Sequence, residues 1–454
     1  MSELPAGWTH FALKDIGGLS GGKTPSKATP KFWSSPDVPW VSPKDMKRDL
    51  LSDSEDKISN EAVDQAGMTL YPANSVLMVT RSGILQHTFP VSMAGTALTV
   101  NQDIKVLRPI EGINPKYSFH LLKGFGSVIL TRCSKAGTTV QSVDSEKLEA
   151  LMLPLPPLAE QTRIAQKLDE LLAQVDTLKT RIDAIPALLK RFRQSVLAAA
   201  VSGRLTEGWR TAHGIDEPQA SWKAIELAEV SALVTSGSRG WAEYYASNGA
   251  IFIRSQDINT DELDTSDTAF VRLPESSEGK RTRVQPQDIL ITITGANVGK
   301  VARVKQALSE AYVSQHVALV RLQRPELAPF VELYLKDVGS GRKKLTELAY
   351  GGGKPGLNLS NIRDLAFALP CLEEQTEIVV RVEQLFAFAE QLEAKVAAAQ
   401  TRIDHLTQSI LAKAFRGELV PQDPNDEPAS VLLERIQAQR AAAPKAKRGR
   451  KASA

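Results

Sequence analysis

One stretch of the chain has residue types and spacing that could hold the phosphates of a nucleotide. The segment GGLSGGKT, residues 17–24, satisfies the pattern G-x-x-x-x-G-K-[ST], in which a helix begins at the Lys-Thr pair and points its amides at the phosphates. Here Pro25 follows at once and Pro30 comes five residues later, and proline lacks the amide donor that a continuing helix needs. The pattern favours a glycine turn that brings Lys23 and Thr24 to a surface, with nucleotide binding as the alternative.

Other catalytic arrangements find no support in the sequence. The six histidines are scattered and the two cysteines, Cys133 and Cys371, lie far apart, so no metal-ligand spacing occurs. A methyltransferase is expected to carry an Asn/Asp-Pro-Pro-aromatic motif, but Leu158 follows the one Pro-Pro pair. We expect no catalytic residue, no cofactor site and no metal site in this chain.

Basic and polar side chains in glycine-rich turns indicate binding instead. Arginine, lysine, glutamine and asparagine read purines in the major groove of DNA, and serine and threonine often hold its phosphates. In the first half of the chain the candidates are Lys23, Thr24, Ser42, Lys44, Arg81, Ser82, Lys135, Thr138, Thr139 and Gln141. In the second half they are Ser238, Arg239, Arg254, Gln256, Asn297, Lys300, Gln315, Lys354 and Asn358. For any single candidate, a solvated surface role is the alternative.

These candidates lie in two copies of one repeated unit. The segment LPPLAEQTRI, residues 155–164, recurs 214 residues later as LPCLEEQTEI, residues 369–378. Upstream, GWTHFALKDI (residues 7–16) matches SWKAIELAEV (residues 221–230) at the same spacing. Alternating apolar residues and turn glycines in this upstream part are typical of strands. A period of this length indicates a duplicated domain whose loops have diverged on a shared scaffold.

A heptad pattern follows each copy of the repeated segment. From Ile164 to Val196 the apolar residues advance by alternate steps of four and three, and the pattern recurs from Ile378 to Ile410. A strict 3.5-residue repeat predicts a coiled coil, and two such helices in one chain most simply pair antiparallel; separate packing on two domains is the alternative. The seam positions are Ile164, Leu168, Leu171, Val175, Leu178, Ile182, Ile378, Val382, Leu385, Leu392, Val396 and Ile403.

Local signals mark the ends and the interior of the two helices. Gly203 and Gly417 occupy matching positions and are plausible C-cap glycines. Pro186 should kink the first helix, because its ring clashes with the carbonyl one turn back, whereas the counterpart Gln400 leaves the second helix straight.

The expected fold class is α+β. Two mixed α/β domains are separated by two long helices that pair as an antiparallel coiled coil, with a pseudo-two-fold internal repeat. The first domain is expected at residues 1–153, its helix at 154–206, the second domain at 207–368 and its helix at 369–420. Residues 421–454 should hold a short helix at Ala429–Arg440 and a basic, disordered tail. The tail contacts DNA phosphates or a partner, or serves solubility alone.

Composition gives more information about the cellular compartment of the protein than about its binding partner. The N-terminus has no basic segment followed by an apolar run, and no stretch of about 18 apolar residues predicts a membrane span. Two cysteines indicate no disulfide framework, so we expect a cytoplasmic protein. The net charge of +3 neither requires nor excludes DNA binding, because basic groups can cluster on one face.

The helix length suggests how two reading domains would share one DNA. Ile164 to Val196 corresponds to about 48 Å of helix, which exceeds one DNA turn of about 34–36 Å. The helices would then act as a ruler for a gap that neither domain reads. A pseudo-two-fold axis places the half-sites in opposite orientations, and the diverged loops predict that they differ in sequence.

The order of these parts resembles the specificity subunit of type I restriction–modification systems. The resemblance covers almost the whole chain up to about Pro421. It rests on GGKTPSKATPKFW (residues 21–33), VPWVSPKDM (38–46), TRSGI (80–84), LPLPPLAEQ (153–161), LLKRFRQSVLAAAVSGRLT (188–206), GGGKPGLNLSNI (351–362) and LPCLEEQ (369–375). Cys371 departs from the first copy, which has Pro157 there.

The resemblance implies a non-catalytic subunit that recognises a bipartite, gapped target in double-stranded DNA. Each α/β domain would be a target-recognition domain and each helix a spacer. Two adenine-specific methyltransferase subunits would dock on the chain, and restriction subunits could join them. S-adenosylmethionine, ATP and Mg²⁺ would belong to those partners. The alternative is a coiled-coil adaptor that binds proteins and not DNA.

Overall fold

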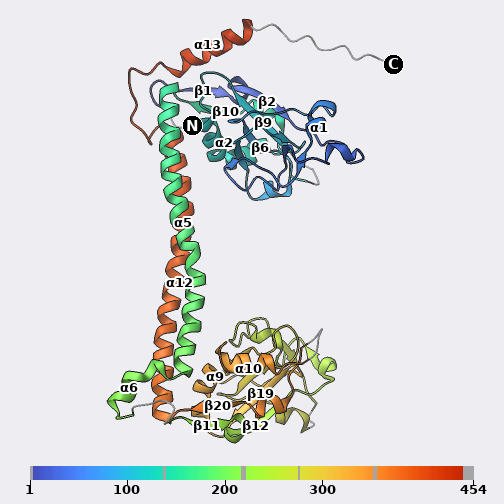
Figure 1. Ribbon diagram of the computed structural model, residues 1–454, viewed down its shortest axis with the longest axis vertical. Helices are drawn as coiled ribbons and strands as arrows, with labels where there is room; N and C mark the ends of the chain where they lie inside the picture. The colour runs from blue at the N-terminus through green and yellow to red at the C-terminus, as the bar shows by residue number, and fades with distance from the viewer. Residues whose placement is uncertain (1–3, 136–139, 216–220, 275–276, 351–354, 443–454) are drawn as a thin grey trace. The chain divides into compact units, whose positions relative to one another are not determined.

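The computed structural model describes residues 4–135, 140–215, 221–274, 277–350 and 355–442. The chain forms two compact units (Figure 1). The first unit contains residues 1–182 and 399–454, and the second contains residues 183–398. Each unit therefore holds one α/β domain together with parts of both long helices.

The first unit is built on an antiparallel sheet with one parallel edge strand. Its strand order is β2-β9-β6-β7-β4, with only β4 parallel to its neighbour β7. These strands span Gly17–Gly21, Ile104–Pro109, Val76–Val79, Val91–Ala94 and Leu50–Leu51. A smaller sheet, β5-β3-β8, spans Lys57–Ile58, Val38–Val41 and Thr99–Val100. Helix α2 (Pro115–Gly124) lies on the large sheet, and α3 (Gly126–Cys133) follows it.

The second unit repeats this topology. Its main sheet has the order β12-β19-β16-β17, at Ser231–Ser236, Val317–Leu322, Ile289–Thr292 and Val301–Arg303. A second sheet, β13-β15-β14-β18, spans Tyr245–Ala246, Ala269–Val271, Ala250–Ile253 and Ala311–Val313. Helices α9 (Ala328–Lys336) and α10 (Gly341–Glu347) correspond to α2 and α3. The predicted mixed α/β class and the internal repeat are confirmed.

In the elements beside and including the long helices, the spacing of 214 residues between the two copies has no shift of even one residue. The two-stranded sheet of β1 (Thr9–Ala12) and β10 (Met152–Leu155) recurs as β11 (Lys223–Glu226) and β20 (Ala366–Leu369). Helices α4 (Ser145–Glu149) and α5 (Leu158–Val201) recur as α11 (Leu359–Arg363) and α12 (Leu372–Phe415). Adding 214 to each bound of the first set gives the matching bound of the second, for example 158 + 214 = 372.

The repeated Glu-Gln pair anchors each domain to the start of its helix. The indole Nε1 of Trp8 donates to Glu160 at 2.9 Å, and that of Trp222 donates to Glu374 at 2.9 Å. Next to each glutamate, a buried glutamine donates to the carbonyl oxygen of a proline before the helix, at Pro156 and at Pro370. The segment therefore occurs twice because each domain is fastened to a helix by the same buried polar contacts.

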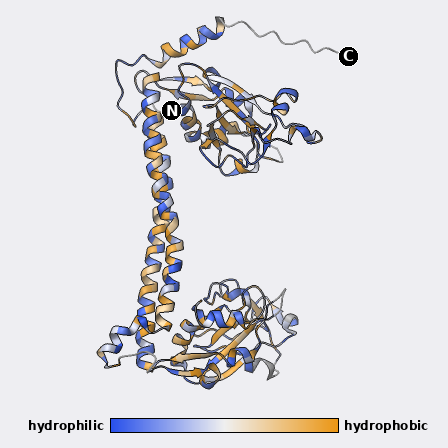
Figure 2. Cartoon of the chain, in the orientation of Figure 1, coloured by the Kyte–Doolittle hydropathy of each residue, from blue (hydrophilic) through white to orange (hydrophobic). Residues whose placement is uncertain are grey.

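The two long helices pair antiparallel. In the first unit, Ile164 and Leu168, near the start of α5, share a core with Ile410 near the end of α12. In the second unit, Val196, near the end of α5, shares a core with Ile378 near the start of α12. Figure 2 shows apolar and hydrophilic residues alternating along both helices. Neither helix is interrupted, and α5 continues through Pro186.

Most of the predicted seam positions are buried or half-buried, and the exception is Leu178. Its side chain is 48% exposed. A helix with 3.6 residues per turn drifts by about 20° per heptad from a strict 3.5 repeat, and Leu178 lies two heptads beyond the anchored Ile164. The buried members are Ile164, Leu168, Val175, Ile378, Val382, Val396 and Ile403. The half-buried members are Leu171, Ile182, Leu385 and Leu392.

The segments that follow the two helices differ. Gly203 and Gly417 both have left-handed backbones, at φ 75° and 74°, as C-cap glycines require. After α5 comes the short α6 (Glu207–Ala212). After α12 comes α13 (Ala429–Ala442), which packs on β1 through Ala429, Leu432 and Ile436. The predicted terminal helix is present, and the basic tail lies outside the described residues.

No helix in the described part of the chain combines the length and the apolar character that crossing a membrane requires.

Candidate nucleic-acid interface

In the first unit, main-chain hydrogen bonds bring four loops together at one end of the large sheet. The amide of Lys23 donates to the carbonyl of Val100 at 3.1 Å, and the amide of Thr80 donates to that of Asp103 at 2.8 Å. The amide of Ser82 donates to the carbonyl of Gln141 at 3.1 Å. We call residues 22–24, 80–84, 101–103 and 140–143 the first loop cluster.

The second unit builds the same arrangement from the corresponding loops. The amide of Gly237 donates to the carbonyl of Ser314 at 3.3 Å, and the amide of Ile293 donates to that of His316 at 2.9 Å. The amide of Leu357 donates to the carbonyl of Ile293 at 2.8 Å, as Val143 does to Thr80 in the first unit. We call residues 237–239, 293–297, 314–316 and 355–358 the second loop cluster.

The glycines of the phosphate-loop pattern serve this packing. Residues 17–21 form strand β2, and no α-helix begins at Lys23 or Thr24; the next helical turn is Pro30–Phe32. A Cβ on Gly22 would stand 1.8 Å from the carbonyl oxygen of Val100. Gly237 is under the same constraint, at 2.1 Å from the carbonyl oxygen of Val313. The structure therefore supports the glycine-turn interpretation, because the helix N-terminus that a phosphate loop needs is missing at this place.

The first loop cluster gathers six of the predicted binding residues. The hydroxyl of Thr24 donates to the side chain of Gln102, and Arg81 Nε donates to Asp103 at 2.6 Å. The terminal nitrogens of Arg81 have no hydrogen bond within the described residues, and its side chain is 56% exposed. The six residues are Lys23, Thr24, Arg81, Ser82 and Gln141 of the cluster itself, together with Lys135, whose amide donates to the carbonyl of Ser142 at 2.9 Å.

Two candidates of the first unit have other roles. Ser42 is buried, and its hydroxyl donates to Asp45 at 3.0 Å. Lys44 lies between Asp56 at 2.9 Å and Glu55 at 3.0 Å, and these hydrogen bonds raise the pKa of its ammonium. Both therefore stabilise the loop that follows β3. Thr138 and Thr139 lie outside the described residues.

The second loop cluster brings together Ser238, Arg239, Asn297, Gln315 and Asn358. Of these, Arg239 is exposed, and Asn358 caps α11 by accepting from the amide of Asn361 at 2.7 Å.

Three candidates of the second unit lie elsewhere in it. Arg254 is held by Asp257 and by the carbonyl of Asp267, and Lys300 pairs with Asp261 at 3.2 Å. Gln256 is exposed beside Arg254. Lys354 lies outside the described residues.

Sequence reasoning missed the apolar residues of the two clusters. Ile84 and Val140 are 43% and 48% exposed in the first cluster, and Tyr350, beside the second, is 64% exposed. Tyr350 exchanges two main-chain hydrogen bonds with Gly356, at 2.9 and 2.8 Å. Aliphatic side chains contact the thymine methyl group, and aromatic rings stack on bases. The sequence signal that could have identified these residues is an apolar residue inside a polar or glycine-rich loop.

Each cluster presents donors, acceptors and one or two apolar groups, a set that fits the edges and the backbone of a nucleic acid. Within the described residues, no group of three or more histidine, cysteine or acidic side chains is placed to hold a metal ion. The clusters share a main-chain frame and differ in the side chains they present, so they are suited to reading two different sequences.

Comparison with known proteins agrees with this arrangement. A family model described as the type I restriction modification DNA specificity domain matches residues 5–187 and again residues 220–399. The chain is 37% identical over 370 residues to the type I restriction enzyme EcoBI specificity subunit of Escherichia coli, covering 74% of each chain. It is 36% identical over 359 residues to the StySPI specificity subunit of Salmonella potsdam, covering 76% of each.

Solved structures share the fold at lower identity. The HsdS subunit from Thermoanaerobacter tengcongensis matches with a TM-score of 0.58 at 20% identity, over 92% of this chain and 98% of that one. A chain from a study of the assembly of a type I R-M system matches with a TM-score of 0.64, also at 20% identity, over 92% and 100%.

Proposed function

The chain belongs to the type I restriction modification DNA specificity family, and from this premise we propose that its two loop clusters read the two halves of one interrupted DNA sequence. One observation carries the proposal. The same main-chain hydrogen bonds assemble both clusters, while the side chains on them differ, as Arg81 and Ser82 do from Thr294 and Gly295. A duplicated frame with different reading groups is what two unlike half-sites require.

The chain supplies specificity, and the chemistry belongs to its partners. We propose that two methyltransferase subunits dock on it, and that restriction subunits join through them. S-adenosylmethionine, ATP and Mg²⁺ would be bound by those subunits. The complex would act in the cytoplasm, where its DNA lies. The adaptor alternative is not favoured, because a chain that bound only proteins would have little use for two such loop clusters on matched frames.

The length of the long helices would set the gap between the half-sites. Each of the helices has 44 residues, or about 66 Å at 1.5 Å per residue. A continuous helix transmits its length without adjustable joints, so the number of unread base pairs should follow the number of helical residues.

A methylation map of genomic DNA tests the proposal. Cells that express the chain with its methyltransferase subunit are compared with cells that lack the chain. The expected result is a gapped motif methylated on both strands only when the chain is present. If the methyltransferase is active with another specificity chain but shows no motif with this one, the domains do not read DNA and the adaptor hypothesis takes over.

Replacing Arg81 by alanine should relax the first half-site alone, and replacing Arg239 should relax the second alone. An arginine contact to a base edge contributes about 1–3 kcal/mol of discrimination, so each variant should lose about 5- to 150-fold in preference at one or two positions. The two variants serve as each other's control, and the measurement is binding to duplexes mutated position by position. Relaxation of both halves by either variant would show that the clusters do not read independently.

A further inference from the structure

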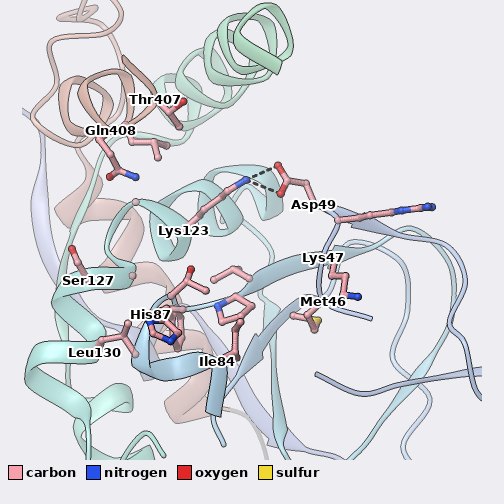
Figure 3. Close-up of a pocket in the computed structure, with 18 residues that line it drawn as sticks. Met46, Lys47, Asp49, Ile84, His87, Lys123, Ser127, Leu130, Thr407 and Gln408 are labelled. Carbon is pink, nitrogen blue, oxygen red and sulfur yellow. Dashed lines mark hydrogen bonds and ion pairs between the residues drawn. The ribbon is translucent and has the colours of Figure 1, made fainter. Parts of the chain in front are cut away.

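A cavity of about 470 Å³ opens beside the first loop cluster. Figure 3 shows it between the recognition domain and the last part of α12, which contributes Thr407 and Gln408. The domain side consists of the loop at residues 46–49, the 3-10 turn Gly83–Gln86 with the segment after it, the end of α2 and the start of α3. All of these parts belong to the first unit.

The side chains that line this cavity carry an excess of positive charge. Lys47, Arg48 and Lys123 are cationic, and Asp49 is the one acidic residue. Asp49 accepts from Lys123 Nζ at 2.6 and 2.7 Å, so these two charges offset each other. Lys47 and Arg48 are exposed and have no acidic partner among the described residues. His87 and the hydroxyls of Thr88 and Ser127 add further polar groups.

A neighbouring cavity of the same size lacks this excess. It also measures about 470 Å³ and shares Asp49, Lys123 and Thr407 with the first. Three lysines and three aspartates line it, giving a net charge of zero. Nε2 of its buried His120 donates to Asp169 at 2.8 Å, and burial lowers the pKa of this histidine, so it adds no charge at neutral pH. The positive field is therefore a property of the first cavity.

The start of α3 also lines this cavity. Gly126 and Ser127 line it, and the N-cap residue Phe125 provides no side-chain hydrogen bond to the first amides of the helix. Helix α2 ends at Gly124, which lines the same cavity, so the dipoles of the two helix ends oppose each other, and the first amides of α3 are the contribution of this helix start. The amides, the two uncompensated cations and the hydroxyls together match the charge and hydrogen-bonding needs of a phosphodiester.

The cavity continues directly from the reading surface. Ile84 belongs to the first loop cluster and also lines the cavity, and His87 follows it by one turn (Figure 3). A DNA backbone that leaves the cluster on the side of this cavity would pass Lys47 and Arg48. We infer that this cavity binds phosphates of the unread gap next to the first half-site. The inference rests on the proposed function and adds a contact that is independent of sequence.

The test is the salt dependence of DNA binding by the variant Lys47→Ala/Arg48→Ala, measured in the complex with its methyltransferase subunits. The probe is a duplex carrying the target found by methylation mapping. Each lost phosphate contact lowers the slope of log affinity against log salt by about 0.9, so we expect a slope smaller by about 1.8. The loss should be equal on the target and on a duplex with scrambled half-sites. Lys190→Ala/Arg191→Ala, on exposed residues of α5, removes the same charge elsewhere and should leave the slope unchanged.

Neutral methylphosphonates in the gap provide the second readout. Placed next to the first half-site, they should weaken the wild type and abolish its difference from the variant; placed next to the second half-site, they should not. An unchanged slope overturns the inference and leaves the proposed function standing. An unchanged slope with weaker methyltransferase binding would assign the cavity to an acidic protein segment. If the wild type does not prefer its target over the scrambled duplex, both this inference and the proposed function are overturned.

Discussion

Replacing Glu374 by glutamine should lower the free energy of unfolding of the second unit by about 3–5 kcal/mol, because it leaves a buried guanidinium without its charge partner. Glu374 and Arg210 have side chains that are 0% and 3% exposed, and their atoms lie 2.5 Å apart. Thr206 and Trp222 also donate to the carboxylate, at 2.8 and 2.9 Å. The loss should appear as faster hydrogen exchange in α6, which carries its partner Arg210, and in β11, which follows its partner Trp222.

The matched variant Glu160→Gln should not destabilise the first unit. Glu160 occupies the equivalent position and accepts from Trp8, but its Oε1 is buried without a hydrogen-bond partner among the described residues. Burial raises the pKa of Glu160, so the fold disfavours its charged form. The destabilisation that comes from burying the charged Glu160 carboxylate is therefore absent at low pH. It appears as pH rises through the raised pKa of the folded state. A neutral glutamine should make the first unit more stable than the wild type near pH 7 and equal to it near pH 4.

A second variant separates loss of charge pairing from general disruption. Arg210→Leu combined with Glu374→Gln removes both charges while the glutamine still accepts from Trp222, so most of the lost protection should return. If Glu374→Gln and Glu160→Gln have equal effects, the buried ion pair does not distinguish the two units.

Deleting one heptad from each long helix should shift recognition to a shorter gap. Removing residues 178–184 and 395–401 shortens each helix by about 10 Å, or about three base pairs of DNA. Affinity for the original target should fall by at least about 1,000-fold, to the level of non-specific binding. The same half-sites with a gap about three base pairs shorter should restore it. Methylation mapping of cells that carry the deletion reads the new gap directly.

A variant of unchanged length controls for the altered sequence of the helix. Replacing residues 178–184 with a copy of residues 171–177 keeps a leucine, a β-branched residue and an aspartate at their heptad positions. This variant should recognise the original gap. If the heptad deletion also keeps the original gap, the helices do not set the spacing.

The architecture could be predicted from the sequence because its signals are local or periodic. The 3.5-residue pattern requires only that one face of a helix be apolar, and the 214-residue spacing survives in β11, β20, α11 and α12 to the residue. The exposure of Leu178 could not be predicted from the heptad pattern, because burial depends on what faces a side chain and a straight helix drifts away from a strict heptad.

For the site, the sequence alone could supply candidate residues by their type, but not which of them lie together. Lys23, Arg81 and Gln141 meet through main-chain hydrogen bonds between segments far apart in sequence, such as the bond from Ser82 to Gln141. Backbone amides look alike in every residue, so no sequence pattern marks these bonds. Ser42 and Lys44 have the same residue types as the candidates in the loop clusters, yet their side chains bind nearby aspartates and a glutamate.

The sequence by itself determined that this protein has two related domains, each followed by a long amphipathic helix, because chain length, periodicity and repetition are properties of the chain. The tertiary structure decided which side chains face one another. Glu160 and Glu374 stand in the same motif, and nothing in that motif tells them apart. The path of the chain after α5 brings Arg210 to Glu374. One carboxylate oxygen of Glu160 has no hydrogen-bond partner among the described residues. The two residues differ because burial and pairing depend on neighbours that are distant in sequence.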